Sequence, residues 1–588
     1  MRYYDTPCPP ANMSWVTDGA SPPRMDASPM FVPKLITALQ EGYGLASLRK
    51  DALSGLTVAI VALPLAMAIA IASGTTPDKG LFTAIVAGFL ISALGGSRHQ
   101  IGGPTAAFVI VVYGVIEKHG FDGLVIATLM AGFMLVLLGA LKLGTLIKFI
   151  PYPVVTGFTA GIAITIFSTQ IKDFFGLQIE HVPADFIAKW GGYVQAASSF
   201  SLHATIIAVL TLGIIVGLRR WKPAWPGMLI AVVATTLAVH WLQLPVDTIE
   251  SRFGAIPNTL PMPELPRGIT LQRMYELLPS AVTIALLAGI ESLLSCVIAD
   301  GMTGRRHRSN IELIGQGVAN IASALFGGLP ATGALARTAT NIKAGALTPV
   351  SGMLHAVFLL VFMWLLAPLA GMVPLAALAG ILVVVAWNMS EAERLKHFLH
   401  APRGDQLVLA VTLILTVLVD ITVALEVGIV LAALVFIRRM VQTTDVTAVA
   451  GADLAERAET EAGATALAAI DIPKGVEVFE ISGPFFFGVA AMLADILDRI
   501  EKAPRVFILR MGNVPLVDAS GIDALGSFID KNRARGTVVL LTRVQPQPLQ
   551  VLREMGLLER LGPGAVQPNL TAALAKARTI VAEPPTAA

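Results

Sequence analysis

The chain has 588 residues, of which 55% are hydrophobic and only 14% are charged. Its mean hydropathy of +0.72 exceeds what a soluble protein of this length needs, so the sequence predicts a membrane protein. The formal net charge of +2 argues against nucleic acid as a partner. The two cysteines, Cys8 in a polar stretch and Cys296 in an apolar one, predict free thiols rather than a disulfide framework.

Residues 1–33 are polar and rich in proline, serine and methionine, and they lack the apolar core of a signal peptide. We expect this tail to be disordered. Between residues 34 and 440, apolar stretches follow one another with short polar breaks. About fourteen can be counted, several of them shorter than the ~20 residues of a straight membrane span. This region predicts a polytopic α-helical membrane domain.

Basic residues concentrate in every second loop of this region, for example at Arg98, Arg219–Lys222, Arg305–Arg308 and Arg438–Arg439. The alternate loops mix acids with bases. The positive-inside rule then predicts that the basic loops and both termini are cytoplasmic.

Two apolar segments are interrupted in the same way, at Gly102–Phe108 and at Leu329–Arg337. Gly, Pro and Thr break each segment, and small helix-forming residues follow. This pattern is typical of half-helices that begin inside the bilayer, where their unpaired N–H groups carry partial positive charge. Two such N-termini aimed at one point predict an anion site. The alternative is two kinked helices packed through small residues.

The spacing also indicates an internal repeat, because Pro64 precedes Pro104 by 40 residues and Glu291 precedes Pro330 by 39. An odd number of helices in each half would invert the second copy relative to the first. Transporters with that arrangement place their substrate at the repeat interface.

Pro104 stands at the start of a helical segment, where the N–H that proline lacks would have no partner within the helix. The first break then offers the N–H groups of Ala106, Ala107 and Phe108 as donors, together with the Thr105 hydroxyl. The second break offers the N–H groups of Gly333, Ala334 and Leu335. The predicted anion-binding residues are Gly103, Pro104, Thr105, Ala106, Ala107, Phe108, Gly333, Ala334, Leu335, Ala336 and Arg337.

Arg337 lies within about one turn of the second break. An arginine inside a membrane costs at least ~2.5 kcal/mol on insertion scales, so we expect it to face a wet cavity or a partner. The alternative is a cation that reaches back to the membrane interface.

Glu291 lies in an apolar segment with no basic residue near it in the sequence, so burial favours its protonated form. A carboxyl that takes up a proton on one side and releases it on the other couples proton flow to anion uptake. The alternative is a structural carboxyl hydrogen-bonded to Ser292 or Ser295. His355 and Asp420 also lie in or near apolar segments, where a core histidine and an interfacial acid are favoured over relay groups.

Residues 441–470 read as a linker, and 471–580 read as a small soluble α/β domain, followed by a tail at 581–588. Alternation at Val476–Ile481 predicts one strand. The apolar runs Val506–Leu509 and Val538–Leu541 predict two buried strands.

Four stretches carry distinctive motifs: Gly55–Pro64, Gly102–Phe108, Ile290–Ser295 and Ala336–Ala339. These motifs resemble those of one family, the SulP anion transporters, and the C-terminal domain resembles their STAS domain. The resemblance implies fourteen segments in two inverted sets of seven, with a core domain that moves as an elevator against a gate domain. It also implies a bacterial inner-membrane location.

Within that family the chain resembles the bacterial four-carbon dicarboxylate transporter most. Many sulfate-type members have Gln where this chain has Leu65, and the more apolar wall suits a dicarboxylate spine; Leu65 therefore joins the predicted anion site. The stretches that support this subgroup are Pro64–Ala68, Gly95–Arg98, Asp300–Gly304 and Ala386–Ala392.

The resemblance also bears on the coupling ion. Sodium-coupled bicarbonate members carry Asp at the position of Glu291, with hydroxyl groups near it. Here Ser295 is a coupling-site neighbour, but Leu335 stands where a further hydroxyl would help. This difference favours protons over sodium, and no metal or organic cofactor is expected.

Val517–Gly521 resembles the STAS motif whose serine is phosphorylated, which makes Ser520 a candidate phosphosite at a helix N-terminus. The alternative is that Ser520 or Asp518 only caps that helix. The resemblance also allows homodimer assembly or docking of acyl carrier protein.

The sequence therefore predicts a secondary active anion transporter, with proton-coupled uptake of four-carbon dicarboxylates. A sulfate or bicarbonate transporter or exchanger of the same family is the open alternative, and a membrane-anchored STAS signalling protein is a different class. The expected partners are a small anion and membrane lipid. No nucleotide-binding loop, metal cluster or catalytic triad indicates an enzyme.

Overall fold

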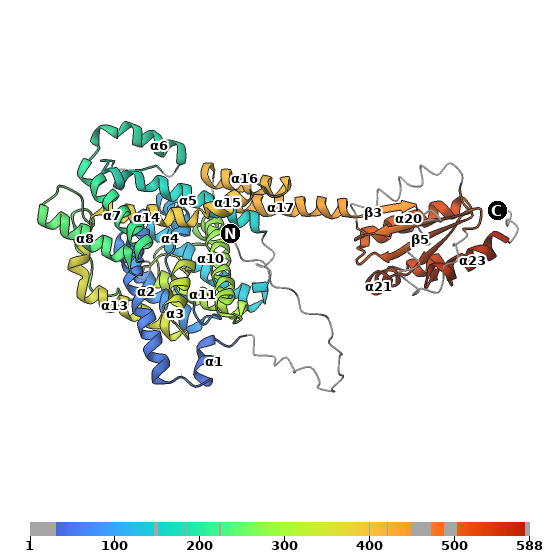
Figure 1. Ribbon diagram of the computed structural model, residues 1–588, viewed down its shortest axis with the longest axis horizontal. Coiled ribbons are helices and arrows are strands. Elements are labelled where there is room, and N and C mark those ends of the chain that lie inside the picture. Colours follow the sequence, from blue (N-terminus) through green and yellow to red (C-terminus); the bar gives the residue numbers. More distant parts are fainter. Residues whose placement is uncertain are drawn as a thin grey trace. The chain divides into compact units, whose positions relative to one another are not determined.

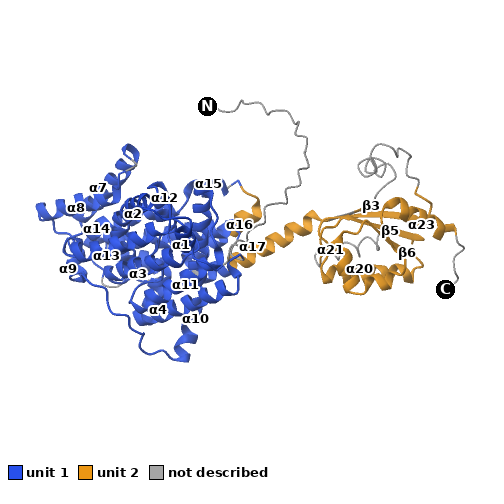
Figure 2. Ribbon diagram, turned by 90° about the horizontal axis from the view of Figure 1, so that it is seen from below, with its two compact units in different colours: residues 1–400, 409–426 blue, residues 401–408, 427–588 orange. Residues whose placement is uncertain are grey.

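The computed structural model divides the chain into two compact units, residues 1–400 with 409–426, and residues 401–408 with 427–588 (Figure 2). The residues described are 31–145, 151–179, 182–183, 185–222, 225–398, 400–419, 421–448, 472–486 and 503–582. The predicted disorder of the N-terminal tail, most of the predicted linker and the residue Asp420 lie outside these ranges.

The membrane region is almost entirely helical (Figure 1). Its first half contains α1 (Lys34–Gln40), α2 (Leu45–Ala72), α3 (Pro77–Leu94), β1 (Gly102–Gly103), η1 (Ala106–Phe108), α4 (Val109–Ala140), α5 (Tyr152–Phe175), α6 (Phe186–Gln195), η3 (Ala197–Ser199), α7 (Leu202–Trp221), α8 (Gly227–Leu242) and α9 (Ile249–Phe253). Its second half contains α10 (Leu271–Thr303), α11 (Ser309–Leu325), β2 (Thr332–Gly333), α12 (Leu335–Lys343), α13 (Val350–Gly371), α14 (Leu375–Met389), α15 (Ala392–Phe398), α16 (Arg403–Leu418) and α17 (Ile421–Thr443).

Among the described residues, eight helices are long and apolar enough to cross a membrane. The shorter apolar helix α8 accompanies them, and α4 joins two helices at Gly120, whose φ of 72° is readily adopted by glycine. The chain thus has the predicted polytopic helical fold with two inverted repeats, in which short segments accompany full spans.

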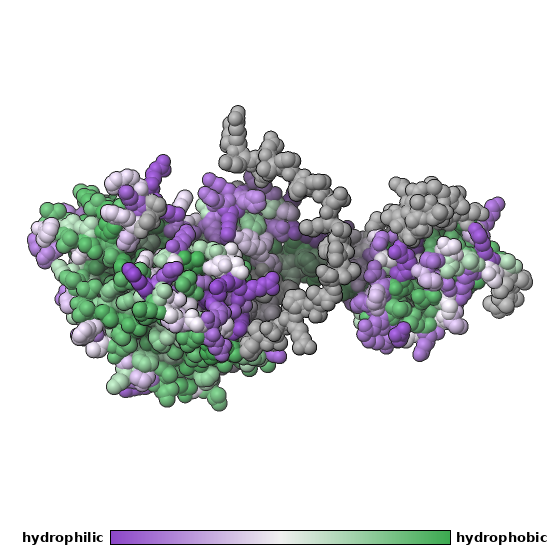
Figure 3. All heavy atoms as spheres, turned by 60° about the horizontal axis from the view of Figure 1, so that its bottom comes forward, coloured by the Kyte–Doolittle hydropathy of each residue, from purple (hydrophilic) through white to green (hydrophobic). Residues whose placement is uncertain are grey.

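The helices fall into two packed groups. In one, α4 packs against α10 and α11, while α13 packs against α2 and α3, so the two halves of the sequence interdigitate. In the other, α14 packs against α5 and α7, and α7 packs against α8. Hydrophobic residues cover much of the visible face of this unit (Figure 3). Such a surface would be unfavourable in water and suits lipid.

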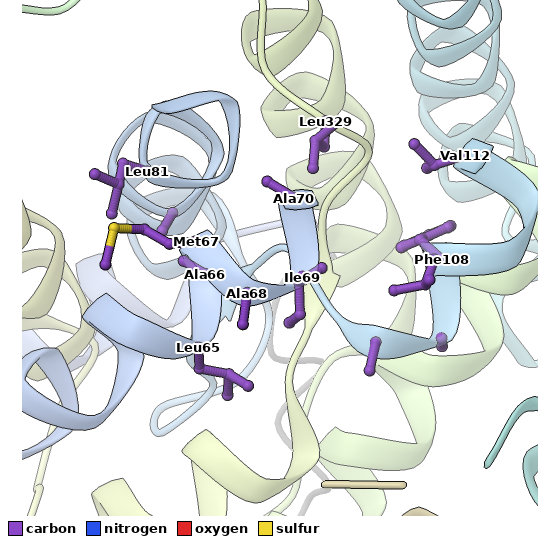
Figure 4. Packing of buried hydrophobic residues seen from close by; sticks show 14 of the residues in the cluster. Leu65, Ala66, Met67, Ala68, Ile69, Ala70, Leu81, Phe108, Val112 and Leu329 are labelled. Carbon is purple, nitrogen blue, oxygen red and sulfur yellow. The ribbon is translucent and has the colours of Figure 1, made fainter. Parts of the chain in front are cut away.

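The core of the first group forms around the middle of α2. Residues Leu65–Ala70 are all buried, and they lie near Leu81, Phe108 and Leu329 (Figure 4). Alanine at alternate positions lets neighbouring backbones approach closely, a common device for helix packing in membranes. This packing holds the two sequence breaks against one another.

The second unit carries a five-stranded sheet in the order β3-β4-β5-β6-β7, parallel except for the β3–β4 pair. Phe507 and Leu509 of β5 pack on one face and Val506 and Ile508 on the other, as expected for a strand buried on both faces. The strands are β3 (Asp445–Ala448), β4 (Val476–Ser482), β5 (Val506–Asn513), β6 (Val538–Thr542) and β7 (Val566–Gln567). The described helices are α20 (Ala519–Ala534), α21 (Pro546–Glu554), α22 (Leu557–Leu561) and α23 (Leu570–Ala582).

This unit confirms the predicted α/β fold. It also corrects one boundary: the segment 441–448, which was expected to be linker, contains the end of α17 and strand β3. Strand β3 pairs with β4, so tertiary contact orders residues whose composition reads as a linker.

Candidate anion-binding site

The two sequence breaks meet as a short antiparallel pair of strands. Gly102 pairs with Gly333 and Gly103 with Thr332, and the pair is buried within the first unit. The Ala334 N–H donates to the Ile101 carbonyl at 2.8 Å and extends the pairing by one residue. Segments more than 200 residues apart therefore converge at one point, as their matched composition predicted.

Glycine is required at this junction. Gly103 has a φ of 142°, and a Cβ added there would lie 2.8 Å from Nη1 of Arg337. Cβ atoms at Gly102 or Gly333 would overlap the side chains of Ile91 or Gln100. The Gly content of both breaks thus reflects close backbone approach as well as backbone conformation.

A helical segment begins directly after each strand. Thr105 is extended, with φ of −121°, before η1 begins at Ala106 and continues into α4. Ala334 is extended, with φ of −89°, before α12 begins at Leu335. Both N-termini therefore start at the same strand pair, where their positive ends add together.

Two of the predicted donors are already engaged. The Phe108 N–H donates to the Thr105 carbonyl at 3.2 Å, and the Ala334 N–H is held by Ile101. The expectation that both N–H groups are free for a ligand is wrong, because the 3₁₀ turn and the strand pair use them. The first-turn N–H groups of Ala106, Ala107 and Leu335 remain the better candidates.

Thr105 and Glu291 are directly joined across the site. The Thr105 hydroxyl donates to Oε2 of Glu291 on α10 at 2.9 Å. The alternative partners are engaged elsewhere: Ser292 donates to Glu312 at 3.0 Å, and Ser295 donates to Thr338 at 3.2 Å. The side chain hydrogen-bonded to Glu291 is thus Thr105, whereas Ser295, the neighbour that the sequence predicted, is bonded to Thr338.

Arg337 is buried beside the first break, with 3% of its surface exposed. Its Nη2 donates to the Pro104 carbonyl, and Nη1 has no hydrogen-bond partner among the described residues. Glu291 lies close enough to attract it electrostatically. The guanidinium therefore bridges the two breaks and does not reach back to an interface, because its partner lies inside the fold.

Four other predicted residues differ in their surroundings. Leu65 is buried in the apolar core, whereas Leu335 and Ala336 are exposed on the first turn of α12. His355 is fully buried, and neither ring nitrogen is hydrogen-bonded to a described residue. It is therefore unlike an ordinary hydrogen-bonded core histidine.

Sequence reasoning missed a buried carboxylate, Glu312 on α11. Its Oε2 accepts hydrogen bonds from the N–H groups of Gly96 at 2.7 Å and Ser97 at 3.2 Å. Its Oε1 accepts from Gln100 at 3.0 Å, Ser292 at 3.0 Å and Gln316 at 2.9 Å. Glu312 thus holds the loop that leads into β1, through Gly96, Ser97 and Gln100, against α10 and α11.

The same helix face holds the second break. The Asn320 side chain donates to the Ala331 carbonyl and accepts from the Ala331 N–H, both at 2.8 Å. Glu312, Gln316 and Asn320 follow one another at four-residue intervals, which places them on one face of α11. That polar stripe in an apolar helix was the available sequence signal.

In the second unit, Asp518 caps α20. Its Oδ1 accepts from the Gly521 N–H at 2.7 Å, as the capping alternative expected. Ser520 is exposed in the first turn of that helix. Its position leaves the hydroxyl accessible, and phosphorylation stays a prediction.

A buried strand pair with two helix N-termini, set in a polytopic helical unit and followed by an α/β domain, defines a membrane transporter with a STAS domain. The sulfate permease family matches residues 48–412 and the STAS domain matches residues 468–573. The chain belongs to the sulfate permease (SulP) family, which confirms the family resemblance, and it is a transporter of this family rather than an enzyme.

Named relatives agree with this membership. The chain is 42% identical to the putative sulfate transporter YvdB of Bacillus subtilis, over 89% of this chain and 96% of the relative. It is 33% identical to the bicarbonate transporter BicA of Synechocystis, over 86% and 91% of the two chains. These names concern sulfate and bicarbonate, and they lend no support to the dicarboxylate subgroup.

Solved structures show the same fold. The murine Slc26a9 anion transporter in its inward-facing state superposes with a TM-score of 0.83 at 17% identity, covering 96% of this chain and 97% of that one. The transmembrane domain of a cyanobacterial BicA superposes with a TM-score of 0.58 at 32% identity, covering 65% of this chain and 98% of that one.

Proposed function

We propose that this protein is a secondary active transporter of a small inorganic oxyanion, with sulfate as the first candidate substrate. The observation that carries the proposal is the convergence of two helix N-termini on the Gly102–Gly333 pair, with Thr105 and Arg337 beside it. Backbone N–H groups and a guanidinium suit an oxyanion. The likeness to YvdB supports sulfate.

Bicarbonate is the second candidate, and the likeness to BicA favours it. A four-carbon dicarboxylate is the third. The apolar Leu65 is the residue that supports it, but Leu65 is packed in the core rather than on an open wall.

Glu291 is the proposed proton-coupling residue. When it is ionised, the Thr105 hydroxyl hydrogen points to Oε2 and is withheld from a ligand. A protonated carboxyl is itself a donor, so Thr105 can accept its hydrogen and turn its own hydroxyl hydrogen toward the anion. Protonation thereby removes a repelling charge and adds a donor, so proton and anion bind together.

Membrane orientation, the transport motion and the protein partners are proposed as well. Basic loops such as Arg305–Arg308 support cytoplasmic termini in a bacterial inner membrane. Motion of the first helix group against the second as an elevator, homodimer assembly and docking of acyl carrier protein rest on the family resemblance.

The test is uptake of labelled sulfate, bicarbonate and succinate into proteoliposomes, with and without an inward proton gradient. We expect the gradient to drive sulfate accumulation in the wild type and not in Glu291→Gln. Glu276→Gln is the matched control, because Glu276 is an exposed carboxylate on the same helix. Gradient-independent accumulation of sulfate in all three proteins would overturn proton coupling. Uptake of succinate alone would overturn the assignment of an inorganic oxyanion as the substrate.

A further inference from the structure

A cavity of about 380 Å³ lies away from the strand pair, among the C-terminal ends of α2 and α5, the first turns of α4, and the short helices α6 and α9. It is at the opposite end of α2 from the basic loops, which is the outer side in the proposed orientation. Tyr113 and Glu117 in its wall belong to the helix that continues η1. About 12 Å of helix separates Tyr113 from Thr105.

The cavity wall carries more positive than negative side chains. Arg252 is paired with Asp173 at 2.7 Å, and Lys172 donates to the Ile179 carbonyl. Among the described residues, the ammonium group of Lys189 on α6 has neither an ion-pair partner nor a hydrogen-bond acceptor. The charged residues of the wall are Glu117, Lys172, Asp173, Lys189 and Arg252.

Lys189 is only 3% exposed, although it carries an ammonium group. Its Nζ lies 5.9 Å from the centre of the Tyr113 ring. Burial lowers the pKa of Lys189 to about 8, and the attraction of Glu117 and Asp185 offsets this only in part. An ammonium that is buried without a hydrogen-bonded counter-ion is costly, and an anion in the cavity would relieve that cost.

We propose that this cavity is a second anion site, an entry site in which Lys189 is the main ligand for one small oxyanion and Lys172 and Arg252 supply additional positive potential. The identity of the occupant as the transported oxyanion rests on the proposed function. The site concentrates the anion close to the first half-helix before it reaches the strand pair, as positively lined clefts do for charged ligands.

Sulfate protection of lysines from reductive methylation tests binding directly. The full-length protein is labelled with and without sodium sulfate, against sodium chloride of equal ionic strength, and each lysine is quantified by mass spectrometry. At a sulfate concentration of twice the dissociation constant, labelling of Lys189 should slow about threefold. Exposed Lys50 and Lys396 are internal controls and should not change. Equal labelling of Lys189 with and without sulfate would overturn the proposal.

Uptake from the outer side tests the role of the site. Lys189→Met should raise the external sulfate concentration for half-maximal uptake by about tenfold, since it removes the central charge. Lys189→Arg should stay near the wild type. Arg267→Met, which removes an exposed cation from the loop before α10, is the matched control and should also stay near the wild type. An unchanged half-saturation in Lys189→Met would overturn the entry role, and if that variant does not fold, the labelling of the wild type decides.

Thr105→Val separates the two sites. It should impair transport and leave sulfate protection of Lys189 intact, because Thr105 is not in the cavity wall. Loss of both transport and the protection of Lys189 in Thr105→Val would show that the cavity is not an independent site. Protection without transport of any of the three anions would contradict the proposed function and leave the entry site standing.

Discussion

Thr105 and Glu291 are joined by a hydrogen bond of 2.9 Å, although 186 residues separate them. The bond links the first residue before η1 to the middle of α10, and so connects the two halves of the repeat. It also makes the orientation of the Thr105 hydroxyl depend on whether the Glu291 carboxyl is protonated. We therefore expect transport to depend more on the hydroxyl group of Thr105 than on the size of the Thr105 side chain.

Thr105→Val should lower the initial rate of sulfate uptake by about 10- to 100-fold, the size expected for a lost hydrogen bond to a charged group. Thr105→Ser keeps the hydroxyl and should retain most of the rate. Uptake into proteoliposomes measures both. A Val variant as active as the Ser variant would show that shape, not the hydroxyl, is what the site needs.

Gly103→Ala should destabilise the membrane unit by about 1–3 kcal/mol, because the residue is held at a positive φ and its Cβ would crowd Arg337. Gly114→Ala is the matched control. Gly114 lies in α4, and outside the adjacent backbone of its own helix no heavy atom is within 4 Å of its added Cβ. Thermal unfolding followed by size-exclusion chromatography compares them, and equal melting temperatures would contradict the crowding argument.

Glu312→Ala should cost about 3–5 kcal/mol, because it leaves buried donors without an acceptor. We expect a loss of folded protein after extraction in detergent. Glu276→Ala, which truncates an exposed acid on α10, should have little effect. A stable Glu312→Ala variant with normal uptake would mean that water replaces the carboxylate.

The sequence predicted the convergence of the two breaks because Gly, Pro and Thr leave a local signal where a helix must be interrupted. It did not predict the partner of Glu291, since Ser292 and Ser295 are near in sequence and Thr105 is near only in space. The donors of Glu312 were equally hidden, because Gly96 lies 216 residues away. The Lys189 cavity was missed for another reason: its loop mixes acids and bases, and only packing shows which charge is left unpaired.

The affinity of the proposed entry site should depend on pH through Lys189. The groups around its ammonium are Tyr113 and Glu117 of α4, Lys172 and Asp173 of α5, Asp185 before α6, and Arg252 of α9. Lys189 has a pKa lowered to about 8, so it is charged below that pH and becomes neutral as the pH rises through it. The half-saturating sulfate concentration should thus be roughly constant in acid, rise about fivefold by one pH unit above the pKa, and approach at higher pH the rise of about tenfold expected for Lys189→Met.

Uptake measured with equal pH on both sides checks this, because no proton gradient is then present. Lys189→Arg should remove the rise, since a guanidinium stays charged over this range. Glu291→Gln should not remove it in whatever uptake that variant retains, because Glu291 is not in the cavity wall. If the rise persists in Lys189→Arg, another group controls the pH dependence, and the buried ammonium is not what attracts the anion.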